Sequence, residues 1–138
     1  MKTILSIFIA TLFSITLHAQ QVNVINNYTD EDKIYTTPVQ VMPKYKAGEE
    51  SLYFRLEHIR YIFEDRMKEI QGKVLVVFVV EKDGTVSNVK MIHGLTEEQD
   101  KEVVRVVSNL RRWKPGMQDG KPVRVQLSIP IEFKMIKA

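Results

Sequence analysis

Residues 74–84, Val-Leu-Val-Val-Phe-Val-Val-Glu-Lys-Asp-Gly, decide the fold of this chain. The seven residues of 74–80 form an unbroken apolar run rich in β-branched side chains, which is typical of a fully buried strand. Asp83-Gly84 is a dipeptide strongly favoured in tight hairpin turns, and residues 85–93 form the return strand. The pattern predicts an antiparallel β-hairpin that begins with residues 74–80.

A third strand is predicted at the end of the chain. Apolar residues alternate with polar ones over residues 123–135, which describes a strand with one buried face and one wet face. Pro130 cannot donate to a ladder, so this strand is expected at a sheet edge. A helix between the hairpin and this strand carries the chain back along the sheet, so the third strand pairs antiparallel with the first. The expected strand order is 2-1-3, with residues 74–80 in the middle.

Two helices complete the predicted fold. Leu52, Leu56, Ile59 and Phe63 recur at helical spacing before Gly72. Residues 96–99, Thr-Glu-Glu-Gln, have the form of a capping box, and a second helix follows with Val103, Val104, Val107 and Leu110 on one face. The sequence therefore predicts an α+β domain: a three-stranded antiparallel sheet, order 2-1-3, with two helices packed on one face.

The composition restricts the function. The chain has 138 residues, a net charge of +3 and no cysteine, so a thiolate nucleophile and a Cys-ligated zinc site are excluded. His58 and His93 have no evident partners, and no metalloprotease, serine-hydrolase, phosphate-loop or dinucleotide motif is present. We expect no enzyme activity, no cofactor and no metal site.

The N-terminus has the pattern of an export signal. Lys2 precedes a 14-residue apolar stretch, residues 4–17, which is short for a membrane span, and His18-Ala19-Gln20 forms a cleavage region. We expect a signal peptide at residues 1–19, a flexible polar arm at residues 20–42 and a folded domain at residues 43–138. Export excludes the usual nucleic-acid partners.

An ordered set of short motifs resembles the C-terminal domain of TonB-family proteins. It extends over roughly residues 43–135. Its first part comprises Gln71-Gly72-Lys73-Val74, Phe78-Val79-Val80 and Asp83-Gly84-Thr85-Val86. Its second part comprises Asp100, Glu102, Arg105-Val106-Val107, Trp113-Lys114-Pro115-Gly116, Gly120-Lys121-Pro122-Val123 and Pro130 to Phe133.

This resemblance implies a periplasmic protein-binding module that docks on plug segments of outer-membrane TonB-dependent transporters by β-strand addition. Two departures leave alternatives open. Tyr61 is followed by Ile62, where the family usually has Tyr-Pro, and no long Pro-rich spacer is present. The alternatives are a cell-envelope module that binds peptidoglycan or has a structural role, and, if the apolar segment is retained, an energy transducer anchored in the inner membrane.

The parity of the last strand predicts the binding edge. Backbone groups of an edge strand alternate between its two sides, and Pro130 is tolerated best where its nitrogen faces away from the first strand. That parity sends the free backbone groups of Arg124, Gln126 and Ser128 outward, where an extended peptide can pair. We also expect Arg124 to attract an acidic segment. The alternative interpretation is that Pro130 and its charged neighbours protect the edge against aggregation.

Two further surfaces are candidates for contacts. Arg111, Arg112, Trp113 and Lys114 form a basic-aromatic cluster that suits an anionic glycan or lipid head group, unless Trp113 is a lid on the core. Leu75, Val77 and Val79 point to the sheet face that two helices leave bare. We expect residues 39–45, or a second copy of the chain in a homodimer, to cover this face.

Overall fold

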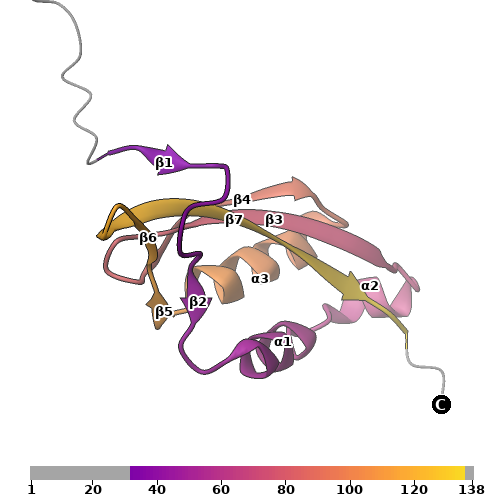
Figure 1. The fold of residues 1–138 in the computed structure, drawn as a ribbon. Helices are drawn as coiled ribbons and strands as arrows, with labels where there is room; N and C mark the ends of the chain where they lie inside the picture. The colour runs from indigo at the N-terminus through magenta and orange to yellow at the C-terminus, as the bar shows by residue number, and fades with distance from the viewer. Residues whose placement is uncertain (1–31, 136–138) are drawn as a thin grey trace, which may run out of the picture.

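The computed structural model describes residues 32–135, and the predicted signal peptide at residues 1–19 lies outside them. Figure 1 shows the order of the helices and strands along the chain. The elements are β1 Ile34–Tyr35, β2 Lys44–Tyr45, α1 Glu49–Glu57, α2 Phe63–Met67, β3 Gly72–Val80, β4 Val86–His93, α3 Glu97–Ser108, β5 Trp113–Lys114, β6 Gly116–Gln118 and β7 Lys121–Phe133.

The three long strands lie as the sequence predicts. β3 pairs antiparallel with β4 on one side and with β7 on the other, from Gly72 opposite Phe133 to Val80 opposite Val125. The sheet nevertheless has more strands than the predicted three. β1 adds to the far side of β7 in parallel, and β6 forms a hairpin with the start of β7. Both added strands are two or three residues long, too short to show a period in the sequence.

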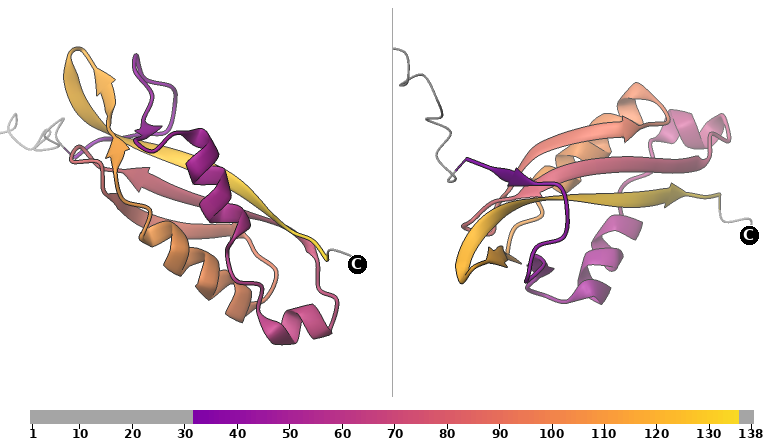
Figure 2. Two further views of the ribbon diagram at one scale, coloured as in Figure 1. Left: turned by 90° about the horizontal axis from the view of Figure 1, so that it is seen from below. Right: turned by 45° about the horizontal axis from the view of Figure 1, so that its top comes forward.

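The core lies between the sheet and the helices. Val74, Val76, Phe78 and Val80 of β3 are buried on the side that faces the helices. The rest of this core comes from two helices and the last strand: Leu52 and Leu56 of α1, Val103 and Val107 of α3, and Ile131 and Phe133 of β7. Seen from the helix side, α1 lies across β7, whereas α3 lies along β3 and β4 (Figure 2). Each of these buried side chains contributes about 1.5–3 kcal/mol of hydrophobic stabilisation.

The first predicted helix is divided in two, so residues 32–135 contain three helices rather than two. α1 ends at Glu57, and α2 starts only at Phe63. The link between them is held by Gln99 of α3, which is fully buried. Its side-chain Oε1 accepts a hydrogen bond from the Ile62 backbone at 2.9 Å, and its Nε2 donates to the Arg60 carbonyl at 3.1 Å. These bonds satisfy backbone groups that a continuous helix would have paired internally.

The same side chain explains why the predicted capping box is only half formed. Thr96 caps α3 by accepting a hydrogen bond from the Gln99 backbone at 3.2 Å, as the pattern predicts. The Gln99 side chain does not return this bond, because it is committed to the link between α1 and α2. The Thr96 hydroxyl in turn donates to Asp65 of α2, a buried carboxylate. Gln99 and Thr96 thus join the start of α3 to the region that leads into the sheet.

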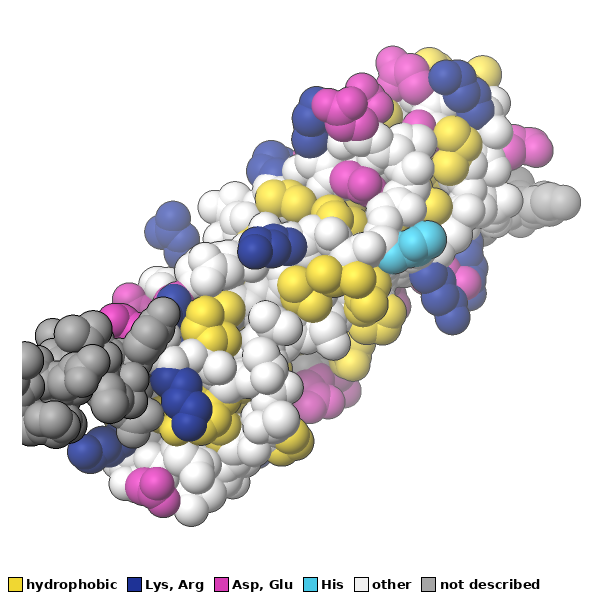
Figure 3. All heavy atoms as spheres, turned by 90° about the horizontal axis from the view of Figure 1, so that it is seen from above, with side chains coloured by type: hydrophobic (Ala, Val, Ile, Leu, Met, Phe, Trp, Pro, Cys, Tyr) yellow, Lys and Arg dark blue, Asp and Glu magenta, His cyan; other side chains and the backbone are white. Residues whose placement is uncertain are grey.

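The sheet face opposite the helices is only partly covered. Leu75 and Val77 are half-buried there, while Val79 is buried. The predicted cover by residues 39–45 is wrong, because Val41 pairs with Met117 of β6, and β2 pairs with β5. Tyr45 packs against Trp113 in the main core instead. Figure 3 shows this face, with hydrophobic side chains among Lys and Arg.

Of the predicted arm at residues 20–42, the structure describes residues 32–42. They lie against β7 through β1 and against β6 through the bridge at Val41. The division into signal peptide, arm and domain stays a prediction. Within residues 32–135, no helix is both long enough and apolar enough to cross a membrane.

Candidate peptide-binding edge

The outer edge of β7 is the candidate site. β3 occupies one side of β7 from Val125 to Phe133, and β1 pairs with the other side only at Arg124 and Val125. From Gln126 to Phe133, no strand among residues 32–135 pairs with this second side. We call the segment Gln126–Phe133, on the side away from β3, the free edge.

The register supports the predicted parity of this edge. Pro130 lies opposite Leu75 of β3 and has no N–H to donate, so this pair is a non-hydrogen-bonded one. Ser128 and Gln126, two and four positions earlier in β7, are likewise in non-hydrogen-bonded pairs with β3. The backbone groups of Ser128 and Gln126 therefore face outward, and Gln126 has an exposed side chain.

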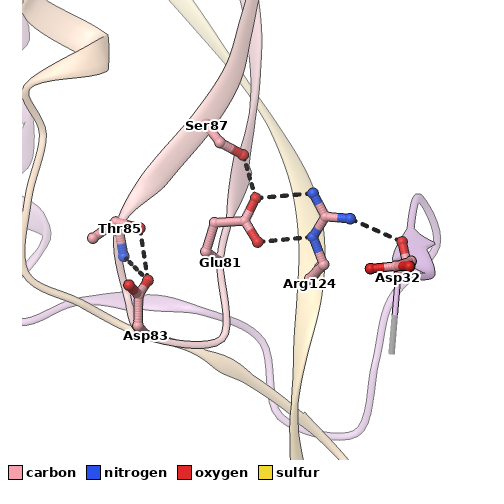
Figure 4. A network of polar contacts seen from close by, with 6 residues as sticks. All are labelled: Asp32, Glu81, Asp83, Thr85, Ser87 and Arg124. Atoms are coloured by element: carbon pink, nitrogen blue, oxygen red, sulfur yellow. Dashed lines mark hydrogen bonds and ion pairs between the residues drawn. The ribbon is translucent and has the colours of Figure 1, made fainter. Parts of the chain in front are cut away.

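Arg124 has a different environment from its predicted one. Its Nε and Nη2 donate to the two carboxylate oxygens of Glu81 at 2.7 and 3.0 Å, and its Nη1 donates to the Asp32 carbonyl at 2.8 Å (Figure 4). Ser87 donates a further hydrogen bond to Glu81. These hydrogen bonds hold the pKa of Glu81 below its usual value, and the contribution of Arg124 is the largest. The guanidinium is thus already paired, which corrects the expectation that it is free to attract an acidic segment. The predicted free backbone edge at Arg124 is also corrected, because β1 pairs with β7 there.

The structure also separates the members of the predicted basic-aromatic cluster. Trp113 is 3% exposed, and its ring lies 5.3 Å from that of Tyr45 and 5.6 Å from that of Phe78. Arg111, Arg112 and Lys114 are exposed around it. Because the ring is inside the core, it cannot contact a ligand together with these cations. The alternative interpretation of Trp113 as a core lid is confirmed.

A groove runs beside the free edge, and sequence reasoning missed it. It has a volume of about 580 Å³ and lies between α1 and the end of β7. α1 and the residue after it contribute Tyr53, Leu56, Glu57 and His58, and the β7 side contributes Pro130, Ile131, Glu132 and Lys134. Tyr53 and Glu57 are one turn apart on α1, beside the buried Leu52 and Leu56. An aromatic residue next to the buried positions of a predicted helix was the feature of the sequence that could have indicated this groove.

The described part of the chain shows no other arrangement that suggests chemistry. Among residues 32–135, no group of three acidic or histidine side chains could hold a metal ion. The candidate site is therefore a strand edge with a side-chain groove next to it. An edge of this kind binds extended peptides through backbone hydrogen bonds.

Comparison with known proteins identifies the family. Residues 57–135 match the family model described as the Gram-negative bacterial TonB protein C-terminal. The chain belongs to this family, as the motif resemblance indicates. The family associates the domain with TonB-dependent transport, and TonB C-terminal domains are periplasmic.

Solved structures of TonB C-terminal domains are similar to this chain at low identity. That from Helicobacter pylori is 20% identical, with 64% of this chain and 81% of that chain covered and a TM-score of 0.49. That from Pseudomonas aeruginosa is 24% identical, with 60% of this chain and 84% of that chain covered and a TM-score of 0.48. A search of curated proteins finds no match.

Proposed function

We propose that this domain binds an extended plug segment of an outer-membrane TonB-dependent transporter by adding it as a strand to the free edge of β7. The observation that carries the proposal is the edge itself: Gln126–Phe133 is continuous strand, and only its β3 side is paired within residues 32–135. The proposed function is binding, with no catalytic step.

β1 supports the proposal, because it already uses the same side of β7. Ile34 and Tyr35 pair in parallel with Arg124 and Val125. The outward backbone groups of β7 therefore accept an added strand at the point where the free edge begins. The pairing of β1 ends at Val125, so no strand within residues 32–135 pairs with this side of β7 from Gln126 onward.

The energetics predict modest affinity. Each added backbone hydrogen bond contributes a net of roughly 0.5–1.5 kcal/mol. Ordering an extended peptide removes much of this gain. We expect a dissociation constant on the order of micromolar.

The test compares two substitutions at one position. Gln126→Pro removes an outward N–H, whereas Gln126→Ala removes the same side chain and keeps the N–H. With fluorescently labelled plug-segment peptides from transporters of the same bacterium, we expect anisotropy to show about tenfold weaker binding for Gln126→Pro. Binding by Gln126→Ala should stay within about twofold of the parent, since the side chain is exposed.

A second probe keeps the test valid if Gln126→Pro fails to fold. Peptides N-methylated at alternate backbone positions lose donors on one side only. Methylation at one parity should abolish binding to the unchanged protein, and methylation at the other parity should be tolerated. Equal binding of both sets, or full binding by a folded Gln126→Pro variant, contradicts strand addition at this edge.

We further propose that the signal peptide at residues 1–19 is removed on export, which leaves the domain free in the periplasm. Mass spectrometry of the N-terminus of the native protein tests this. Retention of Met1 and the apolar run would instead support an anchored energy transducer.

The peptidoglycan-binding alternative is weakened by the burial of Trp113, which leaves only the exposed cations of the cluster. Transporters rather than cell-wall fragments should therefore be enriched in pull-downs from envelope extract.

A further inference from the structure

We propose that the groove between α1 and the free edge receives a lysine or arginine side chain of the added peptide. This inference rests on the proposed function and deepens it, because it assigns the chemistry of one side chain in the bound segment. The groove would then supply selectivity that backbone pairing cannot supply.

The position of the groove relative to the edge is the first argument. Its lining comes from α1, from His58 and from the stretch Pro130–Lys134, and no residue of β3 takes part. Since β3 occupies the inner side of β7, the groove opens on the outer side, where a peptide would add. Figure 2 shows α1 lying across β7 on the helix side of the sheet.

The alternation of side chains is the second argument. Ile131 points to the helix side, because it lies opposite Val74 and both belong to the core. A peptide residue directly opposite Ile131 points to that same side, whichever direction the peptide runs. Its side chain therefore enters the groove, and its two neighbours in the peptide do not.

The walls of the groove suit a long aliphatic stem. Tyr53 is 57% exposed and offers its ring, while Leu56, Pro130 and Ile131 contribute apolar atoms. A lysine or arginine stem can lie along this surface while its charged end stays at the rim.

The charged side chains at the rim of the groove determine whether a cationic or an anionic ligand is favoured. Glu132 is paired with Lys134 at 3.0 Å, so these two charges largely cancel. His58 is engaged with the Phe54 carbonyl through Nδ1 at 2.7 Å and stacks on the Phe54 ring. Glu57 has no ion-pair partner within residues 32–135. The groove is therefore net negative, which favours a cationic side chain and disfavours aspartate or glutamate.

The experiment is a substitution scan on a synthetic plug-segment peptide that binds the full protein. Each position is replaced in turn by lysine, by norleucine, which has an apolar unbranched chain, and by glutamate. At one position we expect lysine to bind about two- to fivefold more tightly than norleucine, and glutamate to bind more weakly than both. This preference should shrink at high salt, since the rim is exposed.

Variants of the protein then locate the effect. Glu57→Gln should remove the preference for lysine over norleucine. Glu50→Gln is the matched control, because it makes the same charge change on α1 at an exposed residue outside the groove, and the preference should persist. Tyr53→Ala should weaken lysine and norleucine peptides alike, by about threefold to tenfold.

The outcomes separate this inference from the proposed function. If peptides bind and Gln126→Pro weakens their binding as expected, but no position prefers lysine, the groove inference is wrong and strand addition stands. The groove inference is equally wrong if the preference for lysine survives Glu57→Gln. If no plug peptide binds the parent protein, the proposed function fails and the groove inference fails with it.

Discussion

Gln99→Leu is the substitution that tests how α1 is held beside the free edge. Gln99 is fully buried, and its amide is the side-chain link between α3 and the segment that joins α1 to α2. Leucine has a similar volume, so the change leaves little cavity. What it removes is the acceptor for the Ile62 N–H and the donor to the Arg60 carbonyl.

The magnitude follows from these two bonds. Each ordinary hydrogen bond contributes a net of about 1 kcal/mol, and a part-buried backbone group left without a partner costs about 1–3 kcal/mol. We therefore expect Gln99→Leu to lower the free energy of unfolding by about 2–4 kcal/mol. For a domain of this size, the midpoint of thermal unfolding should fall by roughly 10–20 °C.

Urea unfolding followed by circular dichroism measures this loss, and Gln99→Glu gives a control with a distinct pH dependence. When protonated, the introduced carboxyl can still accept from Ile62 and donate to Arg60. When ionised, it places a buried charge against a carbonyl oxygen, so burial raises its pKa. Its deficit relative to the parent should be small below pH ~4 and should grow as the pH rises.

Two results would refute this reasoning. One is a Gln99→Leu variant within about 0.5 kcal/mol of the parent, which is the range of ordinary surface changes. The other is a Gln99→Glu deficit that does not change with pH. Either result would mean that the link between α1 and α2 is held by side-chain packing rather than by the buried amide.

Two further predictions concern the hairpin and the ion pair. Gly84→Ala should destabilise by more than about 3 kcal/mol in urea unfolding, because Gly84 has φ +81° and an added Cβ would lie 2.2 Å from the Trp113 carbonyl oxygen. Gly120→Ala is its control and should cost about 1–2 kcal/mol, since its φ is +73° and nothing lies within 4 Å; equal losses would contradict the contact. Glu81→Gln should cost about 1–2 kcal/mol near pH 7. Because Arg124 lowers the pKa of Glu81 in the fold, this difference is present above about pH 4.3 and lost as the pH falls through the lower folded value; a difference that persists at pH ~2 would contradict the pairing.

The main sheet could be predicted because the sequence patterns of its strands extend over many residues. Residues 74–80 and 123–135 carry unmistakable strand patterns, and the alternation over the second range identifies its buried face. The link at His58–Ile62 could not be predicted, since Ile59 and Phe63 keep a helical spacing in the sequence. What holds this link is the amide of Gln99, a residue about forty positions away whose local pattern indicates only a helix cap.

The sequence could indicate the orientation of the backbone along the candidate edge, but not the side chains around it. Pro130 alone was enough to assign the outward parity of Gln126 and Ser128, because proline constrains hydrogen bonding locally. The pairing of Arg124 with Glu81 and the groove at Tyr53 both depend on which elements lie next to β7. Such neighbours are set by the packing of α1 and the hairpin turn, which a one-dimensional pattern does not contain.

Under the proposed function, the free edge binds a peptide strand, and its two ends show how it can do so while disfavouring pairing with the same edge of a second copy. Two β7 strands that paired antiparallel around Ser128 would bring the Pro130 of each copy against the region near Gln126 of the other. Extending that pairing in either direction soon meets β1, which covers Arg124 and Val125. A self-paired ladder would therefore be short and lack a donor at each Pro130. A plug segment without proline meets only one such gap and can continue to Phe133. The features that limit aggregation are thus compatible with strand addition, and the same edge can serve both requirements.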